Sequence, residues 1–416
     1  MSLSLIRENR NYRWLVSASA ISNLGDGVSA LAFPWLASLI TRDPLLIALT
    51  AVAARLPWFL FTLPAGVWTD RVDRRALMIR ADIFRALLTF GIVSMVLTTP
   101  PPVQNEALMI AGLCAVAFLL GSAEVLRDNA AQTVLPSVVK ADDLETANGQ
   151  MWTIERVMGH FIGPPLAGLL IAWALPAPFA FDALTFAAAA AFLWLVVIPA
   201  RVAPLREGFW IELRAGLRWI WSHVMIWRLA IILGILNAVA MASLTMLVLF
   251  SQEILGIGAL GHGLLLTAGA TGAVLGGLAA PYLTRWLGPT QCLVSALFVF
   301  AAAYATIGLA HAPWMVALAL AVEAGFGMVW NVVTVSFRQR TIPDALLGRV
   351  NSVYRFFGWG MMPLGALVGG FLVTGLEPSL GRETALRAPY LIGAATVAGL
   401  GLTALFLIKL PARKAP

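Results

Sequence analysis

The sequence has little charge. Only 12% of its 416 residues are Asp, Glu, Lys or Arg, whereas a soluble domain carries about a quarter. Hydrophobic residues make up 60% of the chain, and the mean hydropathy is +0.85. So few charged side chains cannot cover the surface of a water-soluble protein of this length. The composition therefore excludes a soluble protein and favours an integral membrane protein.

Cysteine and histidine are also scarce. The two cysteines, Cys114 and Cys292, both fall inside long apolar runs, where a core thiol is expected, and no disulfide or zinc spacing exists. The chain has no G-x-x-x-x-G-K-[ST] phosphate loop and no nucleophile–base pair. We therefore expect no cofactor, no metal and no direct use of ATP, and we do not expect an enzyme.

The long apolar runs predict an all-α membrane protein with twelve transmembrane helices. Each run has about the 20 residues that cross a bilayer as a helix, and the alternating short strands of a β-barrel are absent. The first run is too long for a signal peptide. The predicted spans are 14–40, 45–68, 82–99, 106–126, 148–173, 177–199, 227–255, 261–284, 290–310, 313–336, 350–375 and 389–410.

The distribution of basic residues predicts the orientation. With both termini in the cytoplasm, most of the 28 Lys and Arg residues fall in the termini and the even-numbered loops. The outer loops then hold only Arg42, Arg382 and Arg387, which is the positive-inside pattern. The basic face would meet the anionic inner leaflet of the bilayer. Nucleic acid is not an expected partner, because these charges are scattered among helix ends.

An amphipathic segment divides the chain. In residues 201–225, Phe209, Trp210 and Leu213 lie near helical spacing while Arg214 and Arg218 fall on the other side, as in a helix lying on a membrane surface. The predicted domains are a six-helix bundle over 1–200, a cytoplasmic linker over 201–226 and a second six-helix bundle over 227–416.

The two halves carry a faint repeat. QTVLP (132–136) matches QRTIP (339–343), and Asn148 then matches Asn351. Because further matches follow in the same order, the halves are predicted to be pseudo-symmetric copies. Parallel six-span repeats with a site at their interface are a transporter architecture.

One loop between predicted spans holds an unusual concentration of charge. GVWTDRVDRR (66–75) resembles motif A of the major facilitator superfamily, G-x-x-x-D-R/K-x-G-R-R/K, with Asp73 in place of a glycine. The resemblance implies the major facilitator fold over the whole chain. It also implies a conformational latch, in which Asp70 meets the N-terminus of the eleventh span near 348–351 and Arg71 or Arg74 pairs with Asp128. The latch residues are Gly66, Asp70, Arg71, Asp73, Arg74, Arg75 and Asp128. The alternative is a solvated loop that only sets topology.

Span five carries a second signature. GHFIGPPLAG (159–168) resembles motif C of the same superfamily, G-x-x-x-G-P-x-x-G-G, which is associated with proton-coupled exporters. Its matching residues are Gly159, Gly163, Pro164 and Gly168, while Ala167 replaces a glycine. The alternative is ordinary close packing of small residues between helices.

Further stretches resemble the enterobactin-exporter-like and macrolide-efflux-like branch of the superfamily. They include SNLGDGVSALAFPW (22–35) and FDALTF (181–186). The resemblance implies a monomeric secondary transporter of the bacterial inner membrane that exports a medium-sized amphipathic molecule, a drug or a siderophore, in exchange for protons. A lipid or lysophospholipid translocator of the same fold and a non-transporting sensor stay open as alternatives.

Ionisable groups inside the predicted spans are the candidates for proton coupling, because such groups are costly in a membrane and usually functional. Asp26 lies near the middle of span one and Arg55 near the middle of span two. A structural ion pair between them and proton binding by Asp26 are both open interpretations. Glu323 in span ten has no evident basic partner and is the second candidate. Asp182 is expected near the outer end of span six, where water reaches it.

A transport cavity needs a few polar anchors in mostly apolar walls. The candidates combine amide groups with aromatic faces at similar depths of the two halves. They are Asn23, Trp152, Asn237, Asn331 and Tyr354.

Overall fold

The computed structural model describes residues 4–69, 72–197, 218–219 and 221–410. These residues are almost entirely helical, and none of them forms a strand. The chain is divided into two compact units. Unit 1 comprises 1–42, 49–204 and 257–267, and unit 2 comprises 43–48, 205–256 and 268–416. The predicted amphipathic linker helix lies almost wholly outside the described residues.

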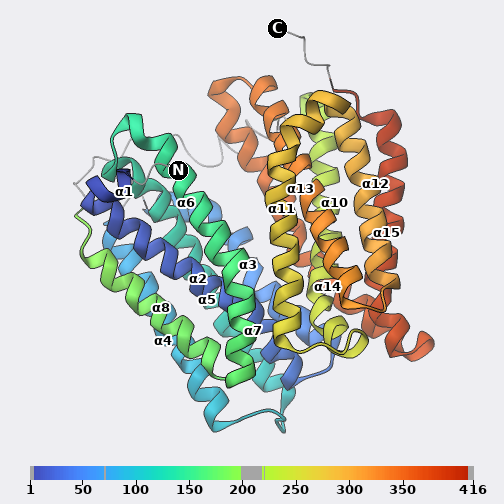
Figure 1. The fold of residues 1–416 in the computed structure, drawn as a ribbon, viewed down its shortest axis with the longest axis horizontal. Helices are drawn as coiled ribbons and strands as arrows, with labels where there is room; N and C mark the ends of the chain where they lie inside the picture. The colour runs from blue at the N-terminus through green and yellow to red at the C-terminus, as the bar shows by residue number, and fades with distance from the viewer. Residues whose placement is uncertain (1–3, 70–71, 198–217, 220, 411–416) are drawn as a thin grey trace. The chain divides into compact units, whose positions relative to one another are not determined.

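The helices of the N-terminal half follow one another along the chain with short connections (Figure 1). Their bounds are α1 (Ser4–Glu8), α2 (Arg10–Ile40), α3 (Pro44–Thr69), α4 (Arg74–Thr98), α5 (Glu106–Val138), η1 (Ala141–Asp143), α6 (Leu144–Ile154), η2 (Glu155–Ile162), α7 (Gly163–Trp173) and α8 (Ala177–Trp194).

The helices of the C-terminal half are likewise long and joined by short connections. Their bounds are α10 (Val224–Leu249), η3 (Phe250–Ile254), α11 (Ala259–Leu287), α12 (Pro289–Leu309), α13 (Pro313–Thr341), α14 (Asp344–Leu380) and α15 (Arg382–Leu407).

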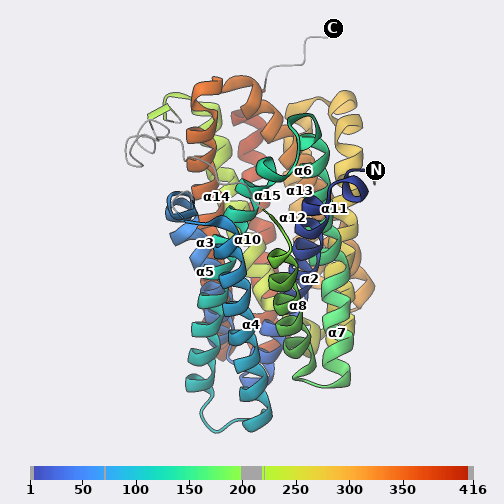
Figure 2. The ribbon, with the colours of Figure 1, turned by 90° about the vertical axis from the view of Figure 1, so that its left-hand side faces the viewer.

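Several helices extend beyond the spans predicted from hydropathy. Helix α5 runs to Val138 rather than ending near 126, and α4 begins at Arg74 rather than near 82. Hydropathy detects only the apolar part of a helix, whereas backbone hydrogen bonding continues into the charged turns beyond it. The α4–α5 hairpin is seen from the side in Figure 2.

Ten of the described helices are long and apolar enough to cross a membrane, so the predicted count of twelve spans is not confirmed by this criterion. The predicted spans 14–40 and 148–173 fall on α2 and on α6–η2–α7, which are not among the ten. Helix α2 has 31 residues and is about 46 Å long, but Ser, Asn and Asp lower its hydropathy. The second region is interrupted by η2, a π-helical segment, which leaves two α-helices of 11 residues each.

Within unit 1, α8 packs against α2 and α4, and α2 also packs against η2 and α7. Figure 1 shows α4 and α8 side by side. A cluster of buried side chains fills one end of this unit, including Tyr12, Leu15, Met78, Val134 and Leu193. The packing brings α2, α4 and α8 together although they are separated in sequence.

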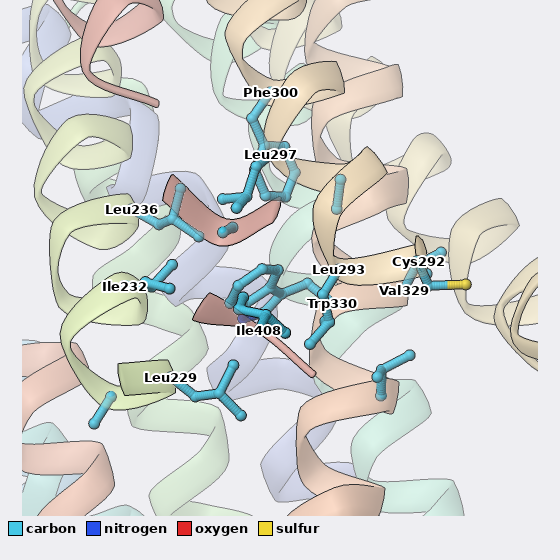
Figure 3. Packing of buried hydrophobic residues seen from close by; sticks show 14 of the residues in the cluster. Leu229, Ile232, Leu236, Cys292, Leu293, Leu297, Phe300, Val329, Trp330 and Ile408 are labelled. Carbon is cyan, nitrogen blue, oxygen red and sulfur yellow. The ribbon is translucent and has the colours of Figure 1, made fainter. Parts of the chain in front are cut away.

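Within unit 2, α10 packs against α14, and α12 packs against α13 and α15. Figure 3 shows the core between these helices, where Leu229, Ile232 and Leu236 of α10 face Leu293 and Leu297 of α12. Cys292 is buried in this cluster, and Cys114 of α5 is half-buried.

Candidate functional site

An ion pair between α2 and α4 is the centre of the candidate site in unit 1. The Arg85 guanidinium binds the Asp26 carboxylate. The Arg85 side chain is only 2% exposed, whereas that of Asp26 is 28% exposed. The structure thus pairs Asp26 with Arg85 and not with Arg55, the partner in one of the two open interpretations: α2 and α4 both pack against α8, and Arg85 of α4 reaches Asp26. Spans one and two follow one another in the sequence, but this did not determine which arginine pairs with Asp26.

Other groups fix the position of the Arg85 guanidinium. Its Nη1 donates to Ser22 Oγ at 3.2 Å and lies 3.5 Å from Asp82 Oδ1. The guanidinium carbon lies 3.8 Å from the centroid of the Phe186 ring on α8, within the range of a cation–π contact. Arg85 is therefore held from three helices, and a neighbouring carboxylate can compete for it.

The ion pairs continue from Arg85 towards α5. Arg127 Nε donates to Asp82 Oδ1 at 3.0 Å, and Arg127 Nη1 lies 3.4 Å from Asp128 Oδ1. Asp82, Arg85 and Arg127 are all buried, and burial of unpaired charges of this kind would be strongly destabilising. Asp82 and Arg85 are not among the candidate site residues taken from the sequence. Their three-residue spacing on one helix face was the signal that both enter the same buried network.

Asp182 is a further buried carboxyl group of this region. It was expected where water reaches it, but its side chain is fully buried. Ser29 Oγ of α2 donates to Asp182 Oδ2, and Thr185 Oγ1 lies 3.4 Å from Oδ1. Close packing of α2 on α8 excludes water from this carboxyl group.

The described part of motif A binds helix ends inside unit 1. Asp73 is the N-cap of α4, because its Oδ1 accepts a hydrogen bond from Ala76 N at 3.0 Å. Arg74 Nη1 donates to the carbonyl oxygen of Thr133 at 3.2 Å. Arg75 Nε donates to the carbonyl oxygen of Leu193 at 3.0 Å, and its Nη2 donates to that of Trp194. The positive charge of Arg75 thus meets the last turn of α8, where helix carbonyls lack partners.

The rest of the predicted latch is not tested. Asp70 and Arg71 lie outside the described residues, and Gly66 lies in the last turns of α3. Asp128, expected to pair with Arg71 or Arg74, is the partner of Arg127. The contact of Asp70 with the eleventh span stays a prediction.

The glycines of motif C lie where helices approach closely. A Cβ atom on Gly163 would lie 2.6 Å from Gly27 Cα of α2, closer than real Cβ contacts allow. One on Gly168 would lie 2.6 Å from Leu260 Cα, also in unit 1. Gly159 has more room, since its nearest neighbour, Asn23 O, would lie at 3.4 Å. Gly159 belongs to the π-helical segment, which ends directly before Gly163 and Pro164.

The second proton candidate, Glu323, lies in unit 2. Tyr304 of α12 donates a hydrogen bond to Glu323 Oε1 at 3.2 Å. Among the described residues, no Lys or Arg forms an ion pair with Glu323. The two proton candidates therefore have different surroundings: an arginine faces Asp26, and a phenol faces Glu323.

Two of the cavity candidates lie in unit 1 and three lie in unit 2. Within unit 1, Asn23 donates to its own helix at Ser19 O, 2.7 Å away, and the Trp152 side chain is 62% exposed. Within unit 2, Asn237 donates to Gly358 O at 2.8 Å and Asn331 is exposed. Their place in a cavity stays a prediction.

Tyr354 lies in the core of unit 2 rather than on an open surface. It is 2% exposed, its ring lies under the Arg338 guanidinium at 3.8 Å, and its hydroxyl donates to Leu229 O at 3.4 Å. The sequence pattern did not separate it from a cavity residue, because tyrosine suits both environments. Among the described residues, no three His, Cys, Asp or Glu side chains are grouped as metal ligands.

Comparison with known proteins gives relatives over the full length. A model of the family described as transmembrane secretion effector matches residues 3–415. The multidrug efflux pump Tap of Mycolicibacterium fortuitum is 25% identical over 425 residues, covering 95% of this chain and 95% of the pump. The enterobactin exporter EntS of Citrobacter koseri is 24% identical over 421 residues, covering 98% of this chain and 93% of the exporter.

Solved structures share the fold. The nucleoside transporter NupG matches with a TM-score of 0.76 at 13% identity, covering 96% of this chain and 100% of that chain. A bacterial homologue of the iron transporter ferroportin in an inward-facing state matches with a TM-score of 0.73 at 17% identity, covering 97% and 99%. At these identities the likeness shows the fold alone.

Proposed function

The chain belongs to the transmembrane secretion effector family of major facilitator transporters, and on that premise we propose that it is a proton-coupled exporter. The proposed substrate is a medium-sized amphipathic molecule, a drug or a siderophore, carried out across the bacterial inner membrane by alternating access. The observation that carries the proposal is the Asp26–Arg85 ion pair. Its arginine side chain is buried among membrane-spanning helices.

The ion pair supports coupling because a proton and Arg85 compete for one carboxylate. A protonated Asp26 loses its attraction for the guanidinium, and a carboxylate that binds Arg85 resists protonation. If the distance between the two groups differs between the access states, the proton affinity of Asp26 differs with it. Proton binding and the conformational equilibrium are then linked.

The proposed substrate class rests on the relatives. Tap is named a multidrug efflux pump and EntS an enterobactin exporter, and both align with this chain over nearly their whole length. A transporter of amphipathic molecules needs apolar walls with few polar anchors. We propose Asn23, Trp152, Asn237 and Asn331 as such anchors, with both termini in the cytoplasm and a monomer as the working unit.

Transport by purified protein in liposomes tests the function. Proteoliposomes with an imposed proton gradient are loaded with a panel of amphipathic drugs and a catecholate siderophore, and flux is measured with and without the gradient. We expect at least one of these compounds to move only when the gradient is present.

Two results would contradict the proposal and favour another function. Movement of a fluorescent lysophospholipid without a gradient, with no drug or siderophore flux, would make the protein a lipid translocator. Absence of flux for every compound, from protein that remains folded and binds a ligand, would favour a sensor.

A further inference from the structure

Two sequence stretches that resemble the exporter branch meet in the structure around one carboxyl group. Gly25, Asp26 and Ser29 belong to the first stretch on α2, and Asp182 and Thr185 belong to the second on α8. Ser29 Oγ donates to Asp182 Oδ2, and Thr185 Oγ1 lies 3.4 Å from Oδ1. Two hydroxyl groups from two helices therefore surround a carboxyl group that is fully buried.

Gly25 makes room for this arrangement. A Cβ atom on Gly25 would collide with Thr185 Oγ1 and Asp182 Oδ1 and would lie 3.3 Å from Thr185 Cβ. The absence of a side chain on α2 thus lets the Asp182 carboxyl group fit against the helix.

Asp182 differs from its acidic neighbours in its partners. Asp26 and Asp82 each contact Arg85, and Asp82 also contacts Arg127. In the described part of the chain, no Lys or Arg forms an ion pair with Asp182. An ionised carboxylate buried without a counter-ion is strongly disfavoured, and such a group binds a proton instead. The contacts thus favour a neutral carboxylic acid at Asp182.

The charged groups near Asp182 come from two of the three helices that pack against α8. Helix α2 contributes Asp26, and α4 contributes Arg85 with its second partner Asp82. Helix α7 carries no titratable side chain between Gly163 and Trp173.

The Arg85 guanidinium contacts one of the two carboxyl groups and interacts electrostatically with the other. Arg85 binds Asp26 and stacks over Phe186, which is one turn from Asp182 on the same face of α8. Asp26 and Ser29 are likewise one turn apart on α2. Arg85 and Asp182 are thus near neighbours that no ion pair joins in this structure, and the exchange proposed below requires the Arg85 side chain to turn towards Asp182.

We propose that Asp182 stores the transported proton and that Asp26 and Asp182 exchange it by sharing Arg85. In one state Asp182 is a neutral acid and Asp26 is the carboxylate paired with Arg85. In the other, Asp182 has lost its proton and pairs with Arg85, while Asp26 has gained that proton. One O–H bond breaks and one forms, and the net charge stays constant. Asp26, which is 28% exposed, then exchanges the proton with water.

This inference rests on the proposed proton coupling, and its first test measures protonation without transport. Infrared spectra of the purified protein in liposomes should show the C=O stretch of a buried carboxylic acid at neutral pH. We expect Asp182→Asn to remove that band and Ser29→Ala to shift its frequency, because Ser29 Oγ donates to the carboxyl group. Asp142→Asn, an exposed acid in η1, should leave the band unchanged.

The second test measures coupling. Asp182→Asn should lose gradient-driven export while retaining substrate exchange across the membrane without a gradient, and thermal unfolding should show that the variant folds. Thr185→Ser, which keeps a hydroxyl group, should retain export.

Each contrary result has its own meaning. Carboxylic-acid absorption from which Asp182→Asn removes no component, or which loses its component in Asp26→Asn instead, would overturn the assignment. Full gradient-driven export by a folded Asp182→Asn variant would also overturn it. Gradient-independent export by the wild-type protein would reject the proposed coupling itself, and the inference with it.

Discussion

Asp73 occupies a position where motif A usually has glycine, and its contacts give the departure a local reason. Its carboxylate accepts a hydrogen bond from Ala76 N and starts α4. A negative charge at this end also complements the helix dipole. A glycine would provide only the backbone conformation of a cap. The aspartate therefore stabilises the start of α4, the helix that carries Asp82 and Arg85.

The cap at Asp73 predicts different outcomes for two substitutions. Asp73→Ala removes the acceptor and should destabilise the protein by about 0.5–2 kcal/mol, the usual cost of losing an N-cap side chain. Asp73→Asn keeps an acceptor and should remain close to wild type. Thermal unfolding in detergent measures the difference. An equal loss of stability in both variants would mean that charge, rather than the cap, is what Asp73 contributes.

Substitution of Asp26 tests coupling at the Asp26–Arg85 pair. Asp26→Asn cannot titrate and cannot form an ion pair, so gradient-driven export should be lost while substrate exchange without a gradient continues. The variant should fold, because Arg85 keeps Asp82 at 3.5 Å. Export assays and thermal unfolding are run together, with Asp142→Asn as the control. Full gradient-driven export by the folded variant would remove Asp26 from the mechanism, and Glu323 would become the next candidate.

At the scale of elements, α2 and the α6–η2–α7 region depend on each other. The π-helical segment changes the rotation of the chain just before Gly163, and π-helical turns frequently occur at functional sites. Gly163 of α7 then approaches Gly27 of α2 so closely that it has no room for a Cβ atom, and a Cβ atom on Gly27 would collide with the backbone of Gly159. This contact helps to set the position of α2, which carries Asp26.

The close approach predicts opposite effects of alanine at two glycines. Gly163→Ala should destabilise the protein, because its Cβ would lie 2.6 Å from Gly27 Cα. Gly149→Ala in α6 has nothing within 4 Å of the added atom. It should stabilise the helix slightly, by up to about 1 kcal/mol. Thermal unfolding of both variants measures the contrast. Equal melting temperatures would show that α2 and α7 can move apart without cost.

At the scale of the whole molecule, the basic residues predict the topology. Reporter fusions at residues 104 and 140 flank α5, so they should report the outside and the cytoplasm respectively. The physical reason is the excess of Lys and Arg in the even-numbered loops. Activity of both fusions on the same side would contradict the twelve-span orientation, whereas fusions at the two termini should both report the cytoplasm.

Composition and hydropathy determined what could be determined locally, a helical, multi-pass membrane protein, and the motifs resemble those of the major facilitator superfamily. These properties depend on the residue types in each segment, and the family match over residues 3–415 agrees with them. Which side chains meet was decided by packing. Arg85 rather than Arg55 binds Asp26. The Asp182 side chain is buried, and Arg75 donates hydrogen bonds to the last turn of α8. Each of these contacts joins helices that are separated in sequence. Hydropathy specifies that a helix is buried in a membrane, but not which neighbour its polar face meets. That choice follows from how α2, α4 and α8 pack around one another.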